Sequence, residues 1–194
     1  MTGVQTCALP ISDVHYTLGV TLWQQGEFAA AGEELRAAIH AKPDYAEAYY
    51  TLGTVLKQKG ELWDSAAALR EAIRLQPDFA GAHTTLAAVL RQLGDAEGAA
   101  AESKAGAEIA KEKTSEQAAL FATNSGRRLL NAGDLDGAIS QFRAAINSSP
   151  SYAAAHFELG LALHRQGKPE EAEEEFRKAT ALDPRLTPPR SQRK

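Results

Sequence analysis

One pattern constrains the fold more than any other feature of this chain, because the same residues recur every 34 positions. The segment HYTLGVTLWQQGEFAAAGEELRAAIHAKPDY, starting at His15, aligns without a gap with YYTLGTVLKQKGELWDSAAALREAIRLQPDF, starting at Tyr49. Three further copies follow. A fixed period of this length predicts an array of similar units, each burying its apolar face against the next. We place the repeats at 12–45, 46–79, 80–113, 119–152 and 153–186.

Each repeat is expected to form two helices joined by a short turn. In the second repeat, Leu52 and Val55 fall on one face of the first helix. Gly60 follows that helix and can close it in the left-handed conformation. Small residues at Gly53 and Ser65 let the paired helices approach closely, and a larger side chain there would cost about 1–3 kcal/mol. The second helices are expected to stop before the prolines that end four of the repeats: Pro43, Pro77, Pro150 and Pro184. Pro169, just after an inter-helix turn, suits a first helical position.

The period breaks between the third and fourth repeats, which start 39 residues apart. The residues TSEQ at 114–117 have the pattern of a capping box, with Thr114 as the N-cap and Gln117 reaching back. The first helix of the fourth repeat is therefore predicted to begin near Ser115 and to be longer than its counterparts. Two interpretations stay open: a hinge between blocks 12–113 and 114–186, or a tolerated insertion with weaker packing.

The recurring residues resemble the tetratricopeptide repeat from about Ser12 to Leu186. The resemblance implies an all-α fold, a right-handed α-solenoid of about five helix–turn–helix repeats and ten helices, with the first helices lining the inner face. It also implies a protein–protein interaction scaffold, not an enzyme, that holds a peptide or helix of a partner. The large aromatic residue of the family's fourth position is only partly kept, since the chain has His15, Tyr49, His83, Ala122 and His156 there.

Carrying the family's groove positions onto the first helices gives the expected partner-binding residues. They are Tyr16, Val20, Trp23, Gln24, Tyr50, Thr54, Lys57, Gln58, Arg91, Gln92, Arg127, Asn131, Phe157, His164 and Arg165, and the same mapping places Thr123 and Leu130 beside them. The Gln and Asn side chains of this set can form hydrogen bonds with the backbone of an extended peptide, and the tyrosines offer apolar ring faces. A plain preference for Gln as a helix former explains the amides equally well.

The family's carboxylate clamp, which recognises chaperone tails, is not expected here. That clamp needs Lys, Asn and Arg at set groove positions. The chain has uncharged residues at those places, namely Tyr16, Val20, Thr51, Gly81 and Thr85.

Composition excludes several other classes of protein. The net charge of −4 argues against a nucleic-acid partner, which requires a basic face. We recognise no catalytic constellation, phosphate loop, zinc spacing or cofactor motif in the sequence. His15, His83 and His156 recur at one repeat position and are interpreted as packing residues, not metal ligands. The acidic run around Glu173 is interpreted as a solvated helix face.

The two ends of the chain are expected to lie outside the repeats. Residues 1–11 contain the single cysteine, Cys7, and resemble a translated sequencing adapter; an ordinary floppy terminus is the alternative. On the adapter interpretation the native start is missing, the source is a shotgun assembly, most simply bacterial, and the leader is disordered. Residues 187–194 form a basic tail, expected to be disordered, with Arg190, Arg193 and Lys194.

Two further hypotheses about function stay open. The chain is the repeat region of a larger enzyme or regulator whose catalytic domain lay upstream, or it associates with itself through uncapped ends of the array. No run of about 18 apolar residues occurs, so no membrane insertion is expected in this segment. The partner stays unidentified, and the compartment, cytoplasmic or periplasmic, is left open.

Overall fold

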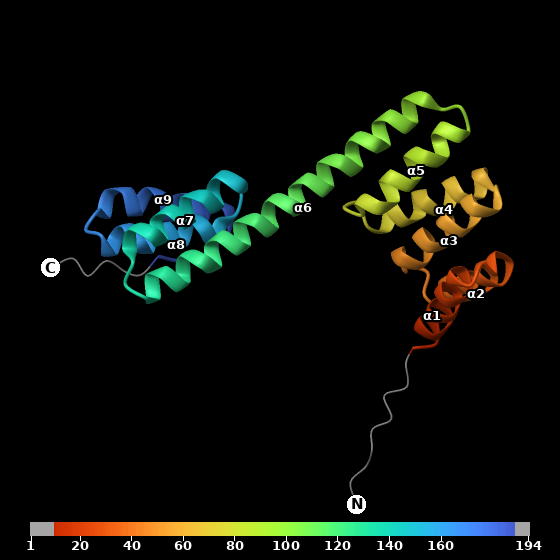
Figure 1. Cartoon of the computed structure of the whole chain (residues 1–194), viewed down its shortest axis with the longest axis horizontal. Coiled ribbons are helices and arrows are strands. Elements are labelled where there is room, and N and C mark those ends of the chain that lie inside the picture. The colour runs from red at the N-terminus through yellow and green to blue at the C-terminus, as the bar shows by residue number, and fades with distance from the viewer. Residues whose placement is uncertain (1–9, 189–194) are drawn as a thin grey trace, which may run out of the picture. The chain divides into compact units, whose positions relative to one another are not determined.

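The computed structural model describes residues 10–188, and the helices found there confirm the all-α prediction (Figure 1). They are α1 (Ile11–Gln24), α2 (Phe28–Ala41), α3 (Ala46–Lys59), α4 (Leu62–Leu75), α5 (Ala80–Gln92), α6 (Ala96–Asn131), α7 (Leu135–Ser148), α8 (Ala153–Arg165) and α9 (Pro169–Leu182). The chain divides into unit 1 (Met1–Ala110) and unit 2 (Lys111–Lys194), so α6 contributes to both.

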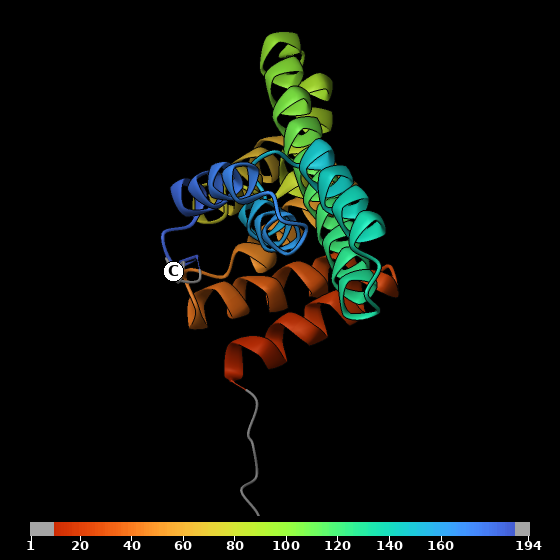
Figure 2. The same ribbon diagram turned by 90° about the vertical axis from the view of Figure 1, so that its left-hand side faces the viewer.

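Unit 1 is a stack of helix pairs. α1 packs on α2 and α3 packs on α4, while α2 also contacts α3 and α4 contacts α5. The pairing of α1 with α2 can be followed in Figure 2, where the two red and orange helices run side by side. Leu35, Leu52 and Val55 form one buried cluster, and Leu69 and Leu86 belong to the next. The apolar stripe of each helix is thus buried against the following pair, as the repeat pattern predicts.

The close approach of the paired helices at Gly53 is confirmed. Ser65 Oγ of α4 donates a hydrogen bond of 2.6 Å to the carbonyl oxygen of Gly53 in α3. A Cβ added to Gly53 would lie 2.6 Å from Leu69 Cγ. Gly60 closes α3 with φ of +81°, a conformation that other residues rarely adopt, so its predicted role as a helix stop is also confirmed.

Unit 2 repeats this architecture with larger side chains at the close contacts. α8 packs on both α7 and α9. Phe142 of α7 is fully buried, and an added Cβ on Gly126 of α6 would lie 2.5 Å from its ring. Phe176 of α9 lies in the same way against Gly160 of α8. In unit 2, a phenylalanine ring of the second helix therefore fills the space beside the glycine of the first helix. Pro169 stands at the predicted start of α9.

The predicted helix boundary at Thr114 is wrong. α6 runs without interruption from Ala96 to Asn131, and Thr114 lies in its interior (Figure 1). The second helix of the third repeat and the first helix of the fourth are thus one helix, so residues 10–188 contain nine helices where about ten were predicted. The physical reason is that residues 96–131 contain no proline and are rich in Ala, Glu and Lys, which favour helix propagation over a new cap.

The ends of the chain lie mostly outside the described residues. Cys7 and the rest of residues 1–9 belong to that part, as do Arg190, Arg193 and Lys194. Ile11, assigned above to the leader, is the first residue of α1. Across residues 10–188, no helix combines the length and apolar character needed to cross a bilayer.

Candidate functional site

The predicted groove residues of unit 1 lie on α1, α3 and α5, and we call this set the first-helix surface. One hydrogen bond joins its members across two repeats: Trp23 Nε1 of α1 donates to Gln58 Oε1 of α3 over 2.7 Å. Side chains at the C-terminal turns of successive first helices therefore meet. Because an indole N–H only donates, the oxygen of Gln58 faces Trp23 and its amide N–H groups stay available.

Two tyrosines of this surface rest on aromatic rings from the end of their own repeat. The ring centroids of Tyr16 and Tyr45 are 5.0 Å apart, and those of Tyr50 and Phe79 are 4.7 Å apart. Both contacts are tilted, a geometry that aromatic pairs favour. Burial, reinforced by a hydrogen bond with Asp13, raises the pKa of Tyr45 to about 12, so this phenol stays neutral beneath Tyr16. We call these two ring pairs, Tyr16–Tyr45 and Tyr50–Phe79, the aromatic platforms. Tyr16 and Tyr50 are half-buried in them.

The remaining residues of the first-helix surface differ in what they offer a ligand. Val20 and Thr54 are half-buried, and the Thr54 hydroxyl already donates to the Tyr50 carbonyl oxygen. Lys57 is half-buried, whereas Arg91 is exposed. The outermost members are exposed amides, Gln24, Gln58 and Gln92. Unit 1 thus offers two aromatic platforms, two cations and a row of amides on three consecutive first helices.

In unit 2, the predicted groove residues form a less regular set. Arg127 Nε donates a hydrogen bond of 2.7 Å to Glu158 Oε1, a residue that the sequence prediction missed. Phe157 is half-buried against Phe176, with ring centroids 5.6 Å apart. The rest are exposed: Asn131, His164 and Arg165. The Arg127 guanidinium is therefore engaged within the chain, whereas Lys57 and Arg91 of the first-helix surface make no ion pair within residues 10–188.

Two residues mapped to the groove are buried instead. Thr123 lies one turn after Ala119, which is packed among the alanines of α7 and α8, and its hydroxyl has no hydrogen-bond partner in the described part of the chain. Leu130 joins the core formed around Phe142. Their placement in the groove was wrong, because α6 packs this face against its neighbours in unit 2.

The recurring histidines each bind a glutamate 19 residues later. Nδ1 lies 2.6 Å from a carboxylate oxygen in all three pairs, which are His15–Glu34, His83–Glu102 and His156–Glu175. The other ring nitrogen of His83 contacts the Pro77 carbonyl oxygen, and that of His156 contacts the Pro150 carbonyl oxygen. Both partners of each ring, a carboxylate oxygen and a carbonyl oxygen, are hydrogen-bond acceptors. All three pairs link the two helices of a pair, and those of His83 and His156 also link them to the loop before them, so the pairs carry a structural role.

The glutamate run of α9 is therefore not uniformly solvated. Glu173 and Glu174 are exposed as expected, but Glu175 is half-buried and bonds both His156 and Lys178. Burial acts to raise the pKa of Glu175, yet the hydrogen bonds from Lys178 and His156 outweigh it and lower the pKa. Among residues 10–188, no three His, Cys, Asp or Glu side chains come together as a metal site would require.

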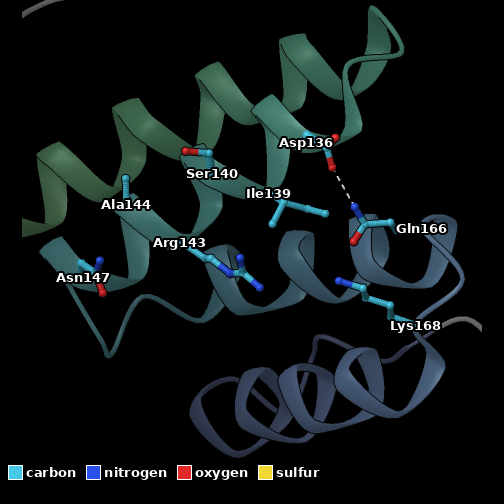
Figure 3. A pocket seen from close by; sticks show the side chains of 8 residues that line it. All are labelled: Asp136, Ile139, Ser140, Arg143, Ala144, Asn147, Gln166 and Lys168. Atoms are coloured by element: carbon cyan, nitrogen blue, oxygen red, sulfur yellow. Dashed lines mark hydrogen bonds between the residues drawn. The ribbon is translucent and has the colours of Figure 1, made fainter.

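A surface hollow of about 570 Å³ lies in unit 2, beside α7 and the turn between α8 and α9 (Figure 3). It is lined by Asp136, Ile139, Ser140, Arg143, Ala144, Asn147, Gln166 and Lys168. Gln166 donates to Asp136 over 2.7 Å, and Glu171 lies 4.0 Å from Arg143 and 3.8 Å from Lys168. Its charges are thus balanced internally, which favours no particular ion, and the first-helix surface remains the stronger candidate.

Comparison with known proteins places these observations in context. Sequence patterns for the tetratricopeptide repeat match residues 50–112 and 123–186, and a related repeat pattern matches 19–60. The unmatched stretch between 112 and 123 coincides with the interior of α6, where the period breaks. Comparison with curated protein sequences gives no match.

Solved structures with similar folds include MamA and YrrB. A MamA crystal structure is 20% identical, with 90% of this chain and 93% of that chain covered and a TM-score of 0.50. MamA from Desulfovibrio magneticus RS-1 is 18% identical, with 90% and 96% covered and a TM-score of 0.49. YrrB, described as a TPR protein with an unusual peptide-binding site, is 24% identical, with 88% and 85% covered and a TM-score of 0.48.

At these identities the likeness to MamA concerns the fold alone. The sequence match is what identifies the family, because it covers well over half of the chain and follows the same period as the helix pairs. With stacked helix hairpins, small residues at their contacts and a glycine in each turn, the chain belongs to the tetratricopeptide repeat family.

Proposed function

We propose that the first-helix surface of unit 1 binds an extended segment of a partner protein. The family membership supports a role as a protein–protein interaction scaffold. The observation that carries the finer proposal is the Trp23–Gln58 hydrogen bond, since it joins side chains of two successive first helices, α1 and α3, across the boundary between repeats. Tyr16 and Tyr50 add preformed aromatic contacts, so little side-chain entropy is lost when a ligand docks on them.

The proposal is tested by selecting binders from a displayed peptide library on the purified chain and measuring their affinity by calorimetry. Replacing Tyr50, Gln58 and Arg91 together by alanine is expected to weaken the selected peptides at least tenfold, because aromatic and arginine contacts dominate most interfaces. Unchanged affinity would remove this surface as the binding site.

A matched control keeps the result specific. Trp63 and Arg70 are exposed on α4, outside the first-helix surface, and offer the same kinds of side chain. Their double replacement by alanine is expected to leave peptide affinity within about twofold. Circular dichroism of each variant shows whether the helices are retained, so that lost binding is not confused with unfolding.

Self-association is a second candidate function, favoured by a row of apolar residues on α1. Ile11, Val14 and Leu18 share one helix face and are 68%, 48% and 44% exposed. Exposed apolar rows of this kind often mark contacts between proteins. The measurement is the solution mass over a range of concentrations, with Leu18→Glu expected to lower any dimer fraction. A strictly monomeric mass at high concentration eliminates this candidate.

A further inference from the structure

We infer that the partner segment is acidic and rich in proline, with carboxylates three residues apart. This inference rests on the proposed function and concerns the C-terminal turns of α1, α3 and α5. Three pairs of neighbouring residues stand there, and we call them the last-turn row: Trp23 and Gln24, Lys57 and Gln58, Arg91 and Gln92.

The charge of the row points to an anionic ligand. Lys57 and Arg91 occupy the same place in successive repeats, and neither makes an ion pair with any residue in the range 10–188. The next lysine, Lys59, bonds Glu61 at 2.6 Å. The carboxylate of Asp95 accepts from the Gly98 backbone at the start of α6. Two nearby acids are thus engaged elsewhere, and the row itself contains none.

The amides of the row strengthen this preference. The oxygen of Gln58 accepts one hydrogen bond from Trp23, and neither N–H donor of that amide makes a hydrogen bond within residues 10–188. The last turns of α3 and α5 thus carry an ammonium group, a guanidinium group and amide N–H groups. A group with several acceptor oxygens and a negative charge, such as a carboxylate, satisfies all three kinds of donor.

The spacing of the repeats selects the shape of the ligand. α3 and α5 contact each other directly, and helices in contact lie about 8–10 Å apart, which gives the order of magnitude of the step from Lys57 to Arg91. A polyproline II segment rises about 3.1 Å per residue with three residues per turn, so every third side chain shares a face at intervals of about 9 Å. In a β-strand, side chains on one face are about 7 Å apart at every second residue and about 13 Å apart at every fourth residue. Neither spacing matches the step between the helices as well.

The aromatic side chains fit the same ligand. Tyr16 and Tyr50 lie on the first-helix surface with rings held in place by Tyr45 and Phe79. Aromatic rings of this kind are the usual docking faces for proline side chains in an extended segment. A segment of the form Glu-Pro-Pro repeated would place prolines on the tyrosines while its carboxylates reach Lys57 and Arg91.

The test uses fluorescein-labelled peptides and the full chain. The probe is a peptide of four Glu-Pro-Pro repeats, compared with a peptide of identical composition whose four glutamates are contiguous and with four Lys-Pro-Pro repeats. We expect the first to bind at least about fivefold tighter than the second, with no binding of the third, and to weaken as salt is raised. Equal affinity of the two acidic peptides would overturn the spacing argument.

Variants separate this inference from the proposed function. Lys57→Gln and Arg91→Gln are each expected to weaken the Glu-Pro-Pro peptide by about two- to fivefold, on the scale of exposed ion pairs. Lys57→Glu with Arg91→Glu should reverse the preference toward the Lys-Pro-Pro peptide. The matched control is Arg70→Glu with Arg74→Glu on α4, which should leave affinity unchanged. If library-selected peptides bind the first-helix surface but are neutral or basic, the proposed function stands and this inference fails.

Discussion

Replacing Gly53 by alanine should destabilise unit 1, although alanine is the better helix former. The gain in helix propensity is about 1 kcal/mol. Against it, the new Cβ would lie 2.6 Å from Leu69 Cγ and 3.2 Å from the Ser65 carbonyl oxygen. Leu69 is fully buried and cannot swing into solvent, so either its rotamer or the spacing of α3 and α4 must change.

The magnitude follows from these contacts. Overpacking of a well-filled core costs about 1–3 kcal/mol. If the helices part, the buried hydrogen bond from Ser65 to the Gly53 carbonyl is weakened as well, at a cost of about 1 kcal/mol. After subtracting the propensity gain, the expected net loss is about 1–3 kcal/mol. For a chain of this size, Tm falls by about 2–4 °C for each kcal/mol.

Gly32 in α2 provides the matched control. An alanine Cβ there would meet only the Arg36 guanidinium at 3.4 Å and Leu52 Cδ1 at 4.0 Å, and the arginine end can move. Gly32→Ala should therefore stabilise the fold by about 0.5–1 kcal/mol. The assay is urea denaturation followed by far-UV circular dichroism, with the midpoint and slope compared for both variants. A Gly53→Ala midpoint at or above that of the wild type would refute the packing argument, as would equal destabilisation by both substitutions.

Three further outcomes are expected. Thr123→Val should stabilise the fold by about 1 kcal/mol in urea denaturation, because it replaces a buried hydroxyl that lacks a partner with a methyl group of similar size; a loss of stability would show that the hydroxyl is bonded. Because the pKa of Glu175 is lowered in the fold, its ionised carboxylate stabilises the folded chain at pH values above the ordinary carboxyl pKa of 4.5. This contribution disappears as the pH falls through the folded-state pKa. Lowering the pH below about 5 should therefore reduce the free energy of unfolding of the wild type more than that of the Glu175→Gln variant. Parallel pH profiles of the two proteins would contradict this. Hydrogen exchange decides between a hinge and a tolerated insertion: protection through residues 100–118 equal to that of the flanking helices removes the hinge, and faster exchange there supports it.

Much of the fold could be predicted from the sequence because its determinants are local and repeated. The 34-residue period fixed the pairing of helices, since each unit needs its neighbour to bury its apolar face. Gly60 and Gly53 were interpreted correctly because each acts through the conformation or size of a single residue. Their environment is set by residues at constant offsets, so five copies of one pattern reinforce the same interpretation.

The boundary at Thr114 failed for a reason that local sequence does not reveal. TSEQ has the chemistry of a capping box, but a cap forms only where the preceding turn is not helical. Here no proline stops the second helix of the third repeat, and helix propagation through Ala- and Glu-rich residues prevails. The same continuous α6 carries Thr123 and Leu130 into the core of unit 2, so the mapping from regular repeats did not hold at these positions.

The histidine–glutamate pairs have a signal in the sequence itself. In the first, third and fifth repeats, histidine at the fourth position comes with glutamate 19 residues later. In the other two repeats, Tyr49 and Ala122 come with Ala68 and Gln141 instead. Two residues that change together across copies of one unit indicate a contact, and the structure shows that contact at 2.6 Å in each case.

The sequence by itself determined the all-α repeat, the turns and the close helix contacts, because those depend on spacing, glycine and side-chain size. Only the tertiary structure decided which candidate residues are engaged and which are free. Arg127 bonds Glu158, whereas Lys57 and Arg91 make no ion pair within residues 10–188. The physical reason is that such pairing depends on where neighbouring repeats bring their side chains, which no single repeat encodes.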